Sequence, residues 1–583
     1  MAEAELLNAL LLNGHIPATV LDEIAVLLRV DIAAGDGSHS SRSWTRRLKR
    51  NVAMPSLYSA KIPTASGGRL HPFRLPSVKA RELWQRDAQY FQMKHQGVPG
   101  RVKTSGNWRA HPLFKEAGLR AAPVTMYGDG VQYVVNKFGK QDSLMCLYFA
   151  FPHRLPAEGE DGDGGWLDHI NVFTVIRKQE ICEETFDAIW DVLVWDAKAM
   201  LAGNFAQERH DGKPFSKGDY LSAMRGQPIA AGVRFAVIQL KQDWEYLCVV
   251  YGLKTWAAKE FCPFCDAPRD PRAWICNGAR SEWRTTIWDH SRFVSALRGE
   301  VRLPDGSVST KVKWTSRLWG VPHLLFSYVK ADPMHVLYTD GVFNKTMGCL
   351  LYQMTVARKD LPGRTIEARV AAAWGVIRDY FHPKAPPIKT LLVKTFRQDG
   401  RDMRPAVQHL VQTRSASETE KQLAGHLGQL NELMCLHHVD ETSAQRWLAA
   451  EINYLSLYIE AGFPTVPKHH MLQHIFMQFH GDCAPRYSYC FAEESKNAKM
   501  AELAQKACNK AGLAERVLLM HELWAATGGT TVSLIKRRRL SKRPAACMDR
   551  LRAADADVHV DVSSGSGVDV AVSSGSEADV DVA

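Results

Sequence analysis

The sequence predicts an α/β protein in which a sheet-containing core is interrupted by a large, mainly α-helical insertion. Three observations carry this prediction. Segments rich in β-branched and aromatic residues follow one another between residues 122 and 242, helical apolar spacing dominates residues 256–480, and an amphipathic helix begins after residue 490. With 583 residues and 46% hydrophobic content, the chain is long enough to form several packed units with real cores.

The N-terminal region is predicted to be helical and basic. Residues 1–50 carry apolar residues at helical spacing, followed by a linker with five Lys or Arg residues between Arg42 and Arg50, around Trp44. Such a linker suits either phosphate binding with base stacking or simple solvation. Residues 51–121 are basic, aromatic and punctuated by Pro and Gly, and we interpret them as an accessory region that contacts DNA.

The first part of the predicted core covers residues 122–255. Asp129 lies between two glycines at the end of the first strand-like segment, and Asp243 follows the last one, at a strand-to-helix switch. In chain order the pattern is strand, strand, strand, helix and strand, which is the order of a ribonuclease-H-like core. The strand-like segments are residues 123–133, 143–152, 169–178 and 235–240, and the helix is residues 183–204.

The remainder of the core is predicted to come late in the chain. Residues 256–480 show no clear sheet pattern, so we interpret them as a helical insertion with Pro and Gly breaks. The core resumes in residues 481–530, where Glu493 and Glu494 stand at the head of a long helix. A helix that carries the last acidic residue would complete a ribonuclease-H-like core.

Three carboxylates brought together in one core repel one another, and divalent metal is the usual compensation. Mg²⁺, or Mn²⁺ in its place, prefers oxygen ligands, and two such ions activate an attacking water or hydroxyl and stabilise the leaving oxygen of a phosphodiester. Asp129, Asp243 and Glu494 are the candidate catalytic ligands, with Glu493 as the competitor for the last position. The alternative is that strand-end aspartates are ordinary turn or cap residues.

The pair Cys262-Pro-Phe-Cys265 stands out among twelve otherwise scattered cysteines. A redox dithiol would follow a strand near the start of a thioredoxin-like unit, and this pair instead precedes a helical insertion. We therefore expect half of a tetrahedral Zn²⁺ site that clamps the insertion 256–480 to the core. The available further ligands are Cys276, His290, His323 and His335.

A second group of histidines lies late in the insertion. His470 and His474 are four residues apart and share one face of a predicted helix. They suit either metal binding or packing near the acidic residues, and packing is the favoured interpretation.

Charge and composition indicate where the protein acts. The net charge is +11, and the basic residues 536–550 and the acidic residues 551–583 cancel each other, so the body keeps the excess. Such an excess suits a polyanionic partner. The run 536–543 reads as a nuclear import signal or a nucleic-acid patch, and residues 531–583 are predicted to be disordered.

The absence of an 18-residue apolar run or a secretory signal argues against membrane insertion and export.

Together these blocks resemble the CACTA-type (CMC superfamily) DDE transposases of eukaryotic DNA transposons. The resemblance spans roughly residues 122–525. Its carriers are Gly128-Asp129-Gly130, the block LKQDWEYL with Asp243, the CPFC pair, the DPMH segment at 332–335, and the late blocks KHHMLQH and FAEESKNAKM.

The resemblance implies a ribonuclease-H-like catalytic domain with Asp129, Asp243 and Glu494 as metal ligands. It implies Cys262, Cys265 and His335 as zinc ligands, with Cys276 as a candidate fourth. It further implies a nuclear protein that acts as a homo-oligomer on double-stranded DNA, at terminal inverted repeats and target sites. The alternative is a nuclear DNA-binding protein derived from a transposase that has lost catalysis.

Overall fold

The computed structural model describes most of residues 57–526, and all described residues belong to one unit, Met1–Gly528. The predicted N-terminal helices (1–50), the basic run 536–543 and the acidic tail therefore lie outside the described residues. Within 57–526 the gaps are 92–104, 136–140, 153–169, 252, 254–257, 269, 271–280, 299, 303–307, 311–315, 340, 383–399, 437–438, 480–484 and 508–511.

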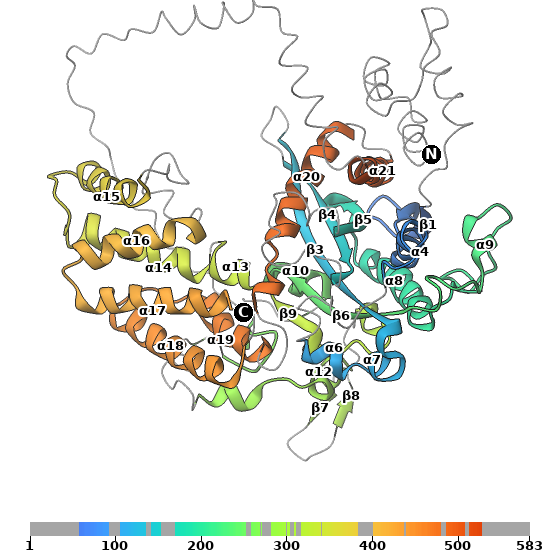
Figure 1. Cartoon of the computed structure of the whole chain (residues 1–583), viewed down its shortest axis with the longest axis horizontal. Coiled ribbons are helices and arrows are strands. Elements are labelled where there is room, and N and C mark those ends of the chain that lie inside the picture. The colour runs from blue at the N-terminus through green and yellow to red at the C-terminus, as the bar shows by residue number, and fades with distance from the viewer. Residues whose placement is uncertain are drawn as a thin grey trace, which may run out of the picture. The chain divides into compact units, whose positions relative to one another are not determined.

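A mixed five-stranded sheet lies at the centre of the described core, in the spatial order β5-β4-β3-β6-β9 (Figure 1). β3 pairs antiparallel with β4, which pairs antiparallel with β5. On its other side β3 pairs in parallel with β6, which pairs in parallel with β9. The strands are β3 (Ala121–Val135), β4 (Gln141–Ala150), β5 (Ile170–Arg177), β6 (Arg234–Gln242) and β9 (Val329–Ala331).

The α/β class and the four strands predicted before Asp243 are confirmed. β5 is buried along its whole length, and its mainly apolar sequence, interrupted by the buried polar residues Asn171, Thr174 and Arg177, suits an element covered on both faces. The expectation that residues 256–480 hold no sheet is wrong, because β9 completes the main sheet and β7 (Glu300–Arg302) pairs with β8 (Val308–Thr310). These strands are three residues long, too short for alternation to reveal them.

Helices pack on the sheet and join it to the N-terminal hairpin. α8 (Thr185–Ala202) packs against β6, α20 (Phe491–Ala507) against β3, and α21 (Leu513–Ala526) against β5. β1 (Tyr58–Ile62) and β2 (Arg69–Phe73) form a hairpin whose buried side chains share the same hydrophobic core. The short helices of this half are α4 (Pro76–Arg86), α6 (Gly106–Ala110), α7 (Pro112–Ala117), α9 (Tyr220–Met224) and α10 (Trp244–Tyr251).

The described residues between 333 and 479 are mainly helical, as their apolar spacing predicts. α17 and α18 pack side by side, with Ser417 and Asp440 accepting hydrogen bonds from backbone N–H groups at their N-termini. The helices are α13 (Pro333–Leu337), α14 (Val342–Tyr352), α15 (Ile366–Phe381), α16 (Gly400–Arg414), α17 (Glu418–Met434), α18 (Glu441–Glu460) and α19 (Pro467–Phe479), preceded by α12 (His290–Arg298).

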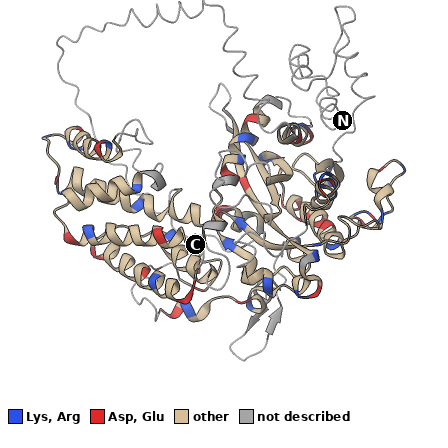
Figure 2. Cartoon of the chain, in the orientation of Figure 1, with Lys and Arg blue, Asp and Glu red and all other residues tan. Residues whose placement is uncertain are grey.

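Short turns of helix connect these elements. They are the 3₁₀ turns η1 (Gly118–Arg120), η4 (Lys178–Glu180), η6 (Glu282–Thr286), η7 (Arg317–Gly320), η8 (Phe326–Tyr328) and η11 (Pro485–Ser488), and the π turn η9 (Gln353–Ala357). Helices α17 and α18 each carry three Glu and one Lys or Arg (Figure 2), so they do not form a basic face. None of the described helices combines the length and hydrophobicity needed to cross a membrane.

Candidate metal centres

Two clusters of metal-ligating side chains converge from distant parts of the chain. The first consists of Cys262, Cys265, His470 and His474 and is called the thiol–imidazole centre here. The two cysteines lie in the loop that follows α10, and the two histidines lie one turn apart on α19. All four side chains are buried.

The donor atoms of the thiol–imidazole centre surround a common point. Cys262 Sγ lies 3.2 Å from His474 Nε2, and Cys265 Sγ lies 3.3 Å from His470 Nε2. His474 Nε2 is 3.3 Å from Cys265 Sγ and 3.1 Å from His470 Nε2. A tetrahedral ion with ordinary Zn–S and Zn–N bond lengths would hold such donors roughly 3.3–3.8 Å apart. The four residues therefore fit a tetrahedral metal with a slight expansion.

Backbone groups and an aromatic ring support this centre. The N–H of Phe264 points to Cys262 Sγ and the N–H of Ala267 to Cys265 Sγ, both at 3.4 Å. Such N–H groups stabilise thiolate charge. The Trp283 ring lies against both imidazoles, with ring centroids 4.6 Å and 4.9 Å apart, and keeps water from the centre.

The protonation states expected in this centre also suit a metal. Burial lowers the pKa of His470 to about 4, so its imidazole is neutral and able to bind a metal. Burial raises the pKa of Cys262. Burial acts in the same direction on Cys265, but hydrogen bonds with Cys262 and the two imidazoles lower the pKa of its thiol instead.

The histidines of this centre differ from those predicted. The expectation that His335 completes the set is corrected, because His335 lies in the second cluster. The favoured interpretation of His470 and His474 as packing residues is also corrected, since their Nε2 atoms face the two thiols. Cys276 lies outside the described residues.

The other two candidate histidines have different neighbours. The Nδ1 atom of His290 accepts a hydrogen bond of 3.2 Å from the backbone N–H of Phe326. The His323 ring packs edge-on against that of His111, with centroids 5.6 Å apart. Both residues therefore cap or pack local structure, away from the thiols.

The second cluster consists of Asp129, His335 and Glu494 and is called the carboxylate centre here. One ligand atom of each residue lies within 4.8 Å of the others. Asp129 comes from β3, Glu494 from the first turn of α20, and His335 from α13. The three side chains are half-buried, so this centre, unlike the first, is partly open to solvent.

Neutral donors hold the two carboxylates in place. The Tyr127 hydroxyl donates to Asp129 Oδ2 at 2.9 Å and lies 3.1 Å from Glu494 Oε1. The side-chain amide of Asn497 donates to Asp129 Oδ2 at 2.7 Å and to Glu494 Oε2 at 3.3 Å. Asn497 is one helical turn after Glu494, and neither it nor Tyr127 was anticipated from the sequence.

The two carboxylates are expected to influence each other's pKa. Burial, followed by the charge of Glu494, raises the pKa of Asp129 to about 8. Burial also acts to raise the pKa of Glu494, but hydrogen bonds from His335 and Asp129 lower it overall. Without a cation, one proton is therefore shared between the two carboxylates, and a divalent ion would replace it.

Both ring nitrogens of His335 have a carboxylate partner. Its Nδ1 atom pairs with Asp332, and its Nε2 atom lies 3.3 Å from Glu494 Oε1. Burial acts to lower the pKa of His335, but Asp332 and Glu494 together raise it to about 10. The sequence signal was the segment DPMH, in which Asp332 caps the short helix and so lies one turn from His335.

Asp243 lies at the edge of the carboxylate centre. It follows β6 and accepts a 2.7 Å hydrogen bond from the backbone N–H of Tyr246, in the first turn of α10. Burial raises the pKa of Asp243, and its own charge contributes to the raised pKa of Asp129. The structure thus brings Asp243 near Asp129 and His335, although it is outside the 4.8 Å set.

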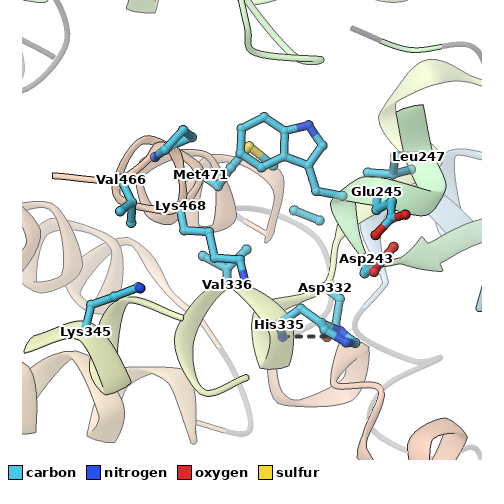
Figure 3. A pocket seen from close by; sticks show the side chains of 13 residues that line it. Asp243, Glu245, Leu247, Asp332, His335, Val336, Lys345, Val466, Lys468 and Met471 are labelled. Carbon is cyan, nitrogen blue, oxygen red and sulfur yellow. Dashed lines mark hydrogen bonds and ion pairs between the residues drawn. The ribbon is translucent and has the colours of Figure 1, made fainter. Parts of the chain in front are cut away.

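A pocket of about 430 Å³ opens beside Asp243 (Figure 3). Asp243 and Glu245 line it together with His335, and Lys345 and Lys468 approach from α14 and α19. The pocket therefore joins acidic and basic groups, an arrangement suited to a metal-bound phosphate. Its apolar lining comprises Trp244, Leu247, Ala331, Val336, Val466, Pro467 and Met471.

The two adjacent glutamates of α20 have different environments. Glu494 joins the carboxylate centre, whereas Glu493 forms a buried ion pair with Lys241 of β6. Neighbouring helical residues point about 100° apart, so both could not enter one site. Of the two predicted candidates, Glu494 is the one beside Asp129.

A comparison with protein-family models and with curated proteins finds no match to this chain.

Proposed function

We propose that this protein is a DDE-type DNA transposase of the CACTA type, with a ribonuclease-H-like catalytic core. The observation that carries the proposal is the convergence of Asp129 and Glu494, which are 365 residues apart. They meet at the carboxyl end of β6, beside Asp243. The strand order supports it as well. Along the chain, β3, β4, β5, α8 and β6 follow one another, which is the order of strands and helix expected for such a core.

The proposed reaction is phosphoryl transfer on double-stranded DNA. Bound Mg²⁺ or Mn²⁺ would lower the pKa of the attacking water or 3′-hydroxyl and neutralise the charge that develops on the phosphate. Asp129, Asp243 and Glu494 would hold the metal, and Tyr127 and Asn497 would orient the carboxylates. These residues act as ligands and positioning groups, and the proposal gives none of them a proton-transfer role.

We assign the thiol–imidazole centre to structural Zn²⁺. Its four ligands are protein side chains that leave no position for a substrate, which is the pattern of structural zinc. The metal would fix the loop 261–267 against α19, and α19 in turn lines the pocket through Lys468 and Met471. Zinc would thus hold the helical residues in position beside the carboxylate centre.

The remaining expectations on partners and location are part of the same proposal. The protein would bind the inverted repeats at transposon ends and join the freed 3′-hydroxyls to target DNA, as a homo-oligomer in the nucleus. The excess of Lys and Arg in residues 1–535 supports a polyanionic partner. An inactive descendant that only binds DNA is the alternative that the following experiment tests.

The test compares Asp243→Asn with the full-length wild type. The substrate is DNA that carries the inverted repeats flanking the gene, with Mg²⁺ or Mn²⁺ and a repeat-free plasmid as the second substrate. We expect Asp243→Asn to abolish nicking at the repeat ends, a loss of at least about 10³-fold, while its DNA affinity stays within about twofold.

Glu208→Gln is the control, since Glu208 is an exposed acidic residue outside the pocket lining and outside both metal clusters. It should cleave like the wild type. Cleavage that survives Asp243→Asn would remove this residue from the active site. Equal nicking of both substrates by the wild type would indicate an unrelated nuclease, and binding without any nicking would indicate the inactive descendant.

A further inference from the structure

His335 has one ring nitrogen committed to a carboxylate and the other directed at the carboxylate centre. Nδ1 pairs with Asp332, and Nε2 lies 3.3 Å from Glu494 Oε1 and within 4.8 Å of a ligand atom of Asp129. The ring therefore presents Nε2 to the point where the two carboxylates meet. This geometry follows from α13, whose first turn places Asp332 and His335 on one face.

Asp332 is itself fixed. Its side chain is buried, and its Oδ1 atom accepts hydrogen bonds from the backbone N–H groups of Met334 at 2.9 Å and Cys490 at 3.3 Å. The orientation of the imidazole is thus set by a carboxylate that lies away from the centre. A carboxylate that orients a histidine in this way is the usual outer partner of a metal-bound imidazole.

An ion pair with Glu494 alone accounts less well for this arrangement. The 3.3 Å separation between His335 Nε2 and Glu494 Oε1 exceeds the 2.7–2.9 Å range typical of charge-assisted hydrogen bonds. Ligand atoms around one ion are usually about 3 Å apart or more, because each lies about 2.1 Å from the metal. The observed separation suits neighbouring ligands of one ion, which would displace the proton through which His335 Nε2 hydrogen-bonds to Glu494 in the metal-free centre.

We propose that His335 Nε2 is a direct metal ligand in the carboxylate centre, together with Asp129 and Glu494, and that the centre prefers Mn²⁺ over Mg²⁺. Imidazole nitrogen is a poorer ligand for the hard Mg²⁺ ion than for a first-row transition metal. The inference deepens the proposed function, because it names the metal preference of the same centre. The binding of metal itself does not depend on DNA cleavage.

The experiment measures metal binding to the full-length, DNA-free protein with its structural zinc intact. Mn²⁺ is titrated and free Mn²⁺ is followed by electron paramagnetic resonance, and Mg²⁺ affinity is obtained by competition. The variants are His335→Gln, which keeps a hydrogen-bond donor, and Asp332→Asn. Glu208→Gln is the control, because Glu208 is exposed and lies outside the pocket lining and the proposed ligand set.

We expect the wild type to bind Mn²⁺ at least about tenfold more tightly than Mg²⁺. His335→Gln should lower Mn²⁺ affinity about 10- to 100-fold and remove the preference, and Asp332→Asn should act in the same direction. Pulsed resonance of the bound Mn²⁺ should detect an imidazole nitrogen that disappears in His335→Gln. Because Asp332 also caps α13, thermal melting checks that each variant folds, and His335→Gln alone decides the question if Asp332→Asn does not fold.

Unchanged Mn²⁺ affinity in His335→Gln, or a bound ion without a nitrogen signal, would overturn the proposal. Equal losses for Mn²⁺ and Mg²⁺ would also overturn it, since they would mean that His335 merely positions Glu494. These outcomes are separable from the proposed function. End cleavage without a nitrogen signal leaves transposition standing, whereas a nitrogen signal without cleavage leaves only the metal centre.

Discussion

The thiol–imidazole centre and the carboxylate centre are both assembled from residues far apart in the chain, yet they differ in burial. The four donors of the first are fully enclosed, and the three ligand residues of the second are half-buried beside an open pocket. The first offers sulfur and imidazole donors, whose thiolate charge is stabilised by backbone N–H groups, whereas the second brings together carboxylates that repel. An enclosed Cys₂His₂ set suits a structural metal, and a partly open set of carboxylates suits a metal that meets substrate.

The largest effect should follow from breaking the enclosed centre. Cys265→Ser removes one of four ligands, and because the binding energy of structural zinc is folding energy, we expect loss of zinc and several kcal/mol of stability. Metal analysis and chemical unfolding check this. Cys349→Ser, at a half-buried cysteine outside both clusters, is the control and should keep the wild-type zinc content. A Cys265→Ser protein with full zinc content would contradict the assignment.

An intermediate effect should come from the ion pair that anchors α20 next to the carboxylate centre. Lys241→Met leaves Glu493 buried without its cation, so we expect a loss of about 3–5 kcal/mol in unfolding free energy. The double variant Lys241→Met/Glu493→Leu removes both charges and should recover most of that loss. A double variant as unstable as the single one would show that the pair does more than balance charge.

A smaller effect is expected at Gly128, next to Asp129. A Cβ there would lie 2.1 Å from Cζ of Tyr246, at the start of α10. Gly128→Ala should therefore push α10 from β3, with a cost of about 1–3 kcal/mol and weaker metal binding, since Asp243 precedes the same helix. Gly130→Ala is the control in the same strand, because its Cβ would meet only Met145 Sδ, at 3.5 Å.

The Gly128 prediction has a direct structural test. Reducing the ring in Gly128→Ala/Tyr246→Leu should restore part of the stability lost in the single variant, measured by chemical unfolding. Additive losses in the double variant, or equal losses in the two glycine variants, would show that close approach of α10 is not what requires glycine.

Much of the core could be predicted from the sequence because its strands are strongly patterned. The Ile-, Val- and Phe-rich sequence of β5 and the apolar segments that lead to Asp129 and Asp243 mark buried strands without any knowledge of their partners. β9 could not be found this way. It has three residues, and it is a strand because β6 presents a free edge beside it.

By itself the sequence determined the chemical types available: carboxylates at strand ends, two thiols at Cys262 and Cys265, and histidines on helices. Which groups meet was decided by the tertiary structure. The packing of α19 brings His470 and His474 to thiols more than 200 residues earlier, and the cap of α13 turns His335 to the carboxylates. The orientation of α20 about its own axis directs Glu494 to the carboxylate centre and Glu493 to Lys241. Local patterns cannot specify these choices, because a helix face has no partner until the elements pack.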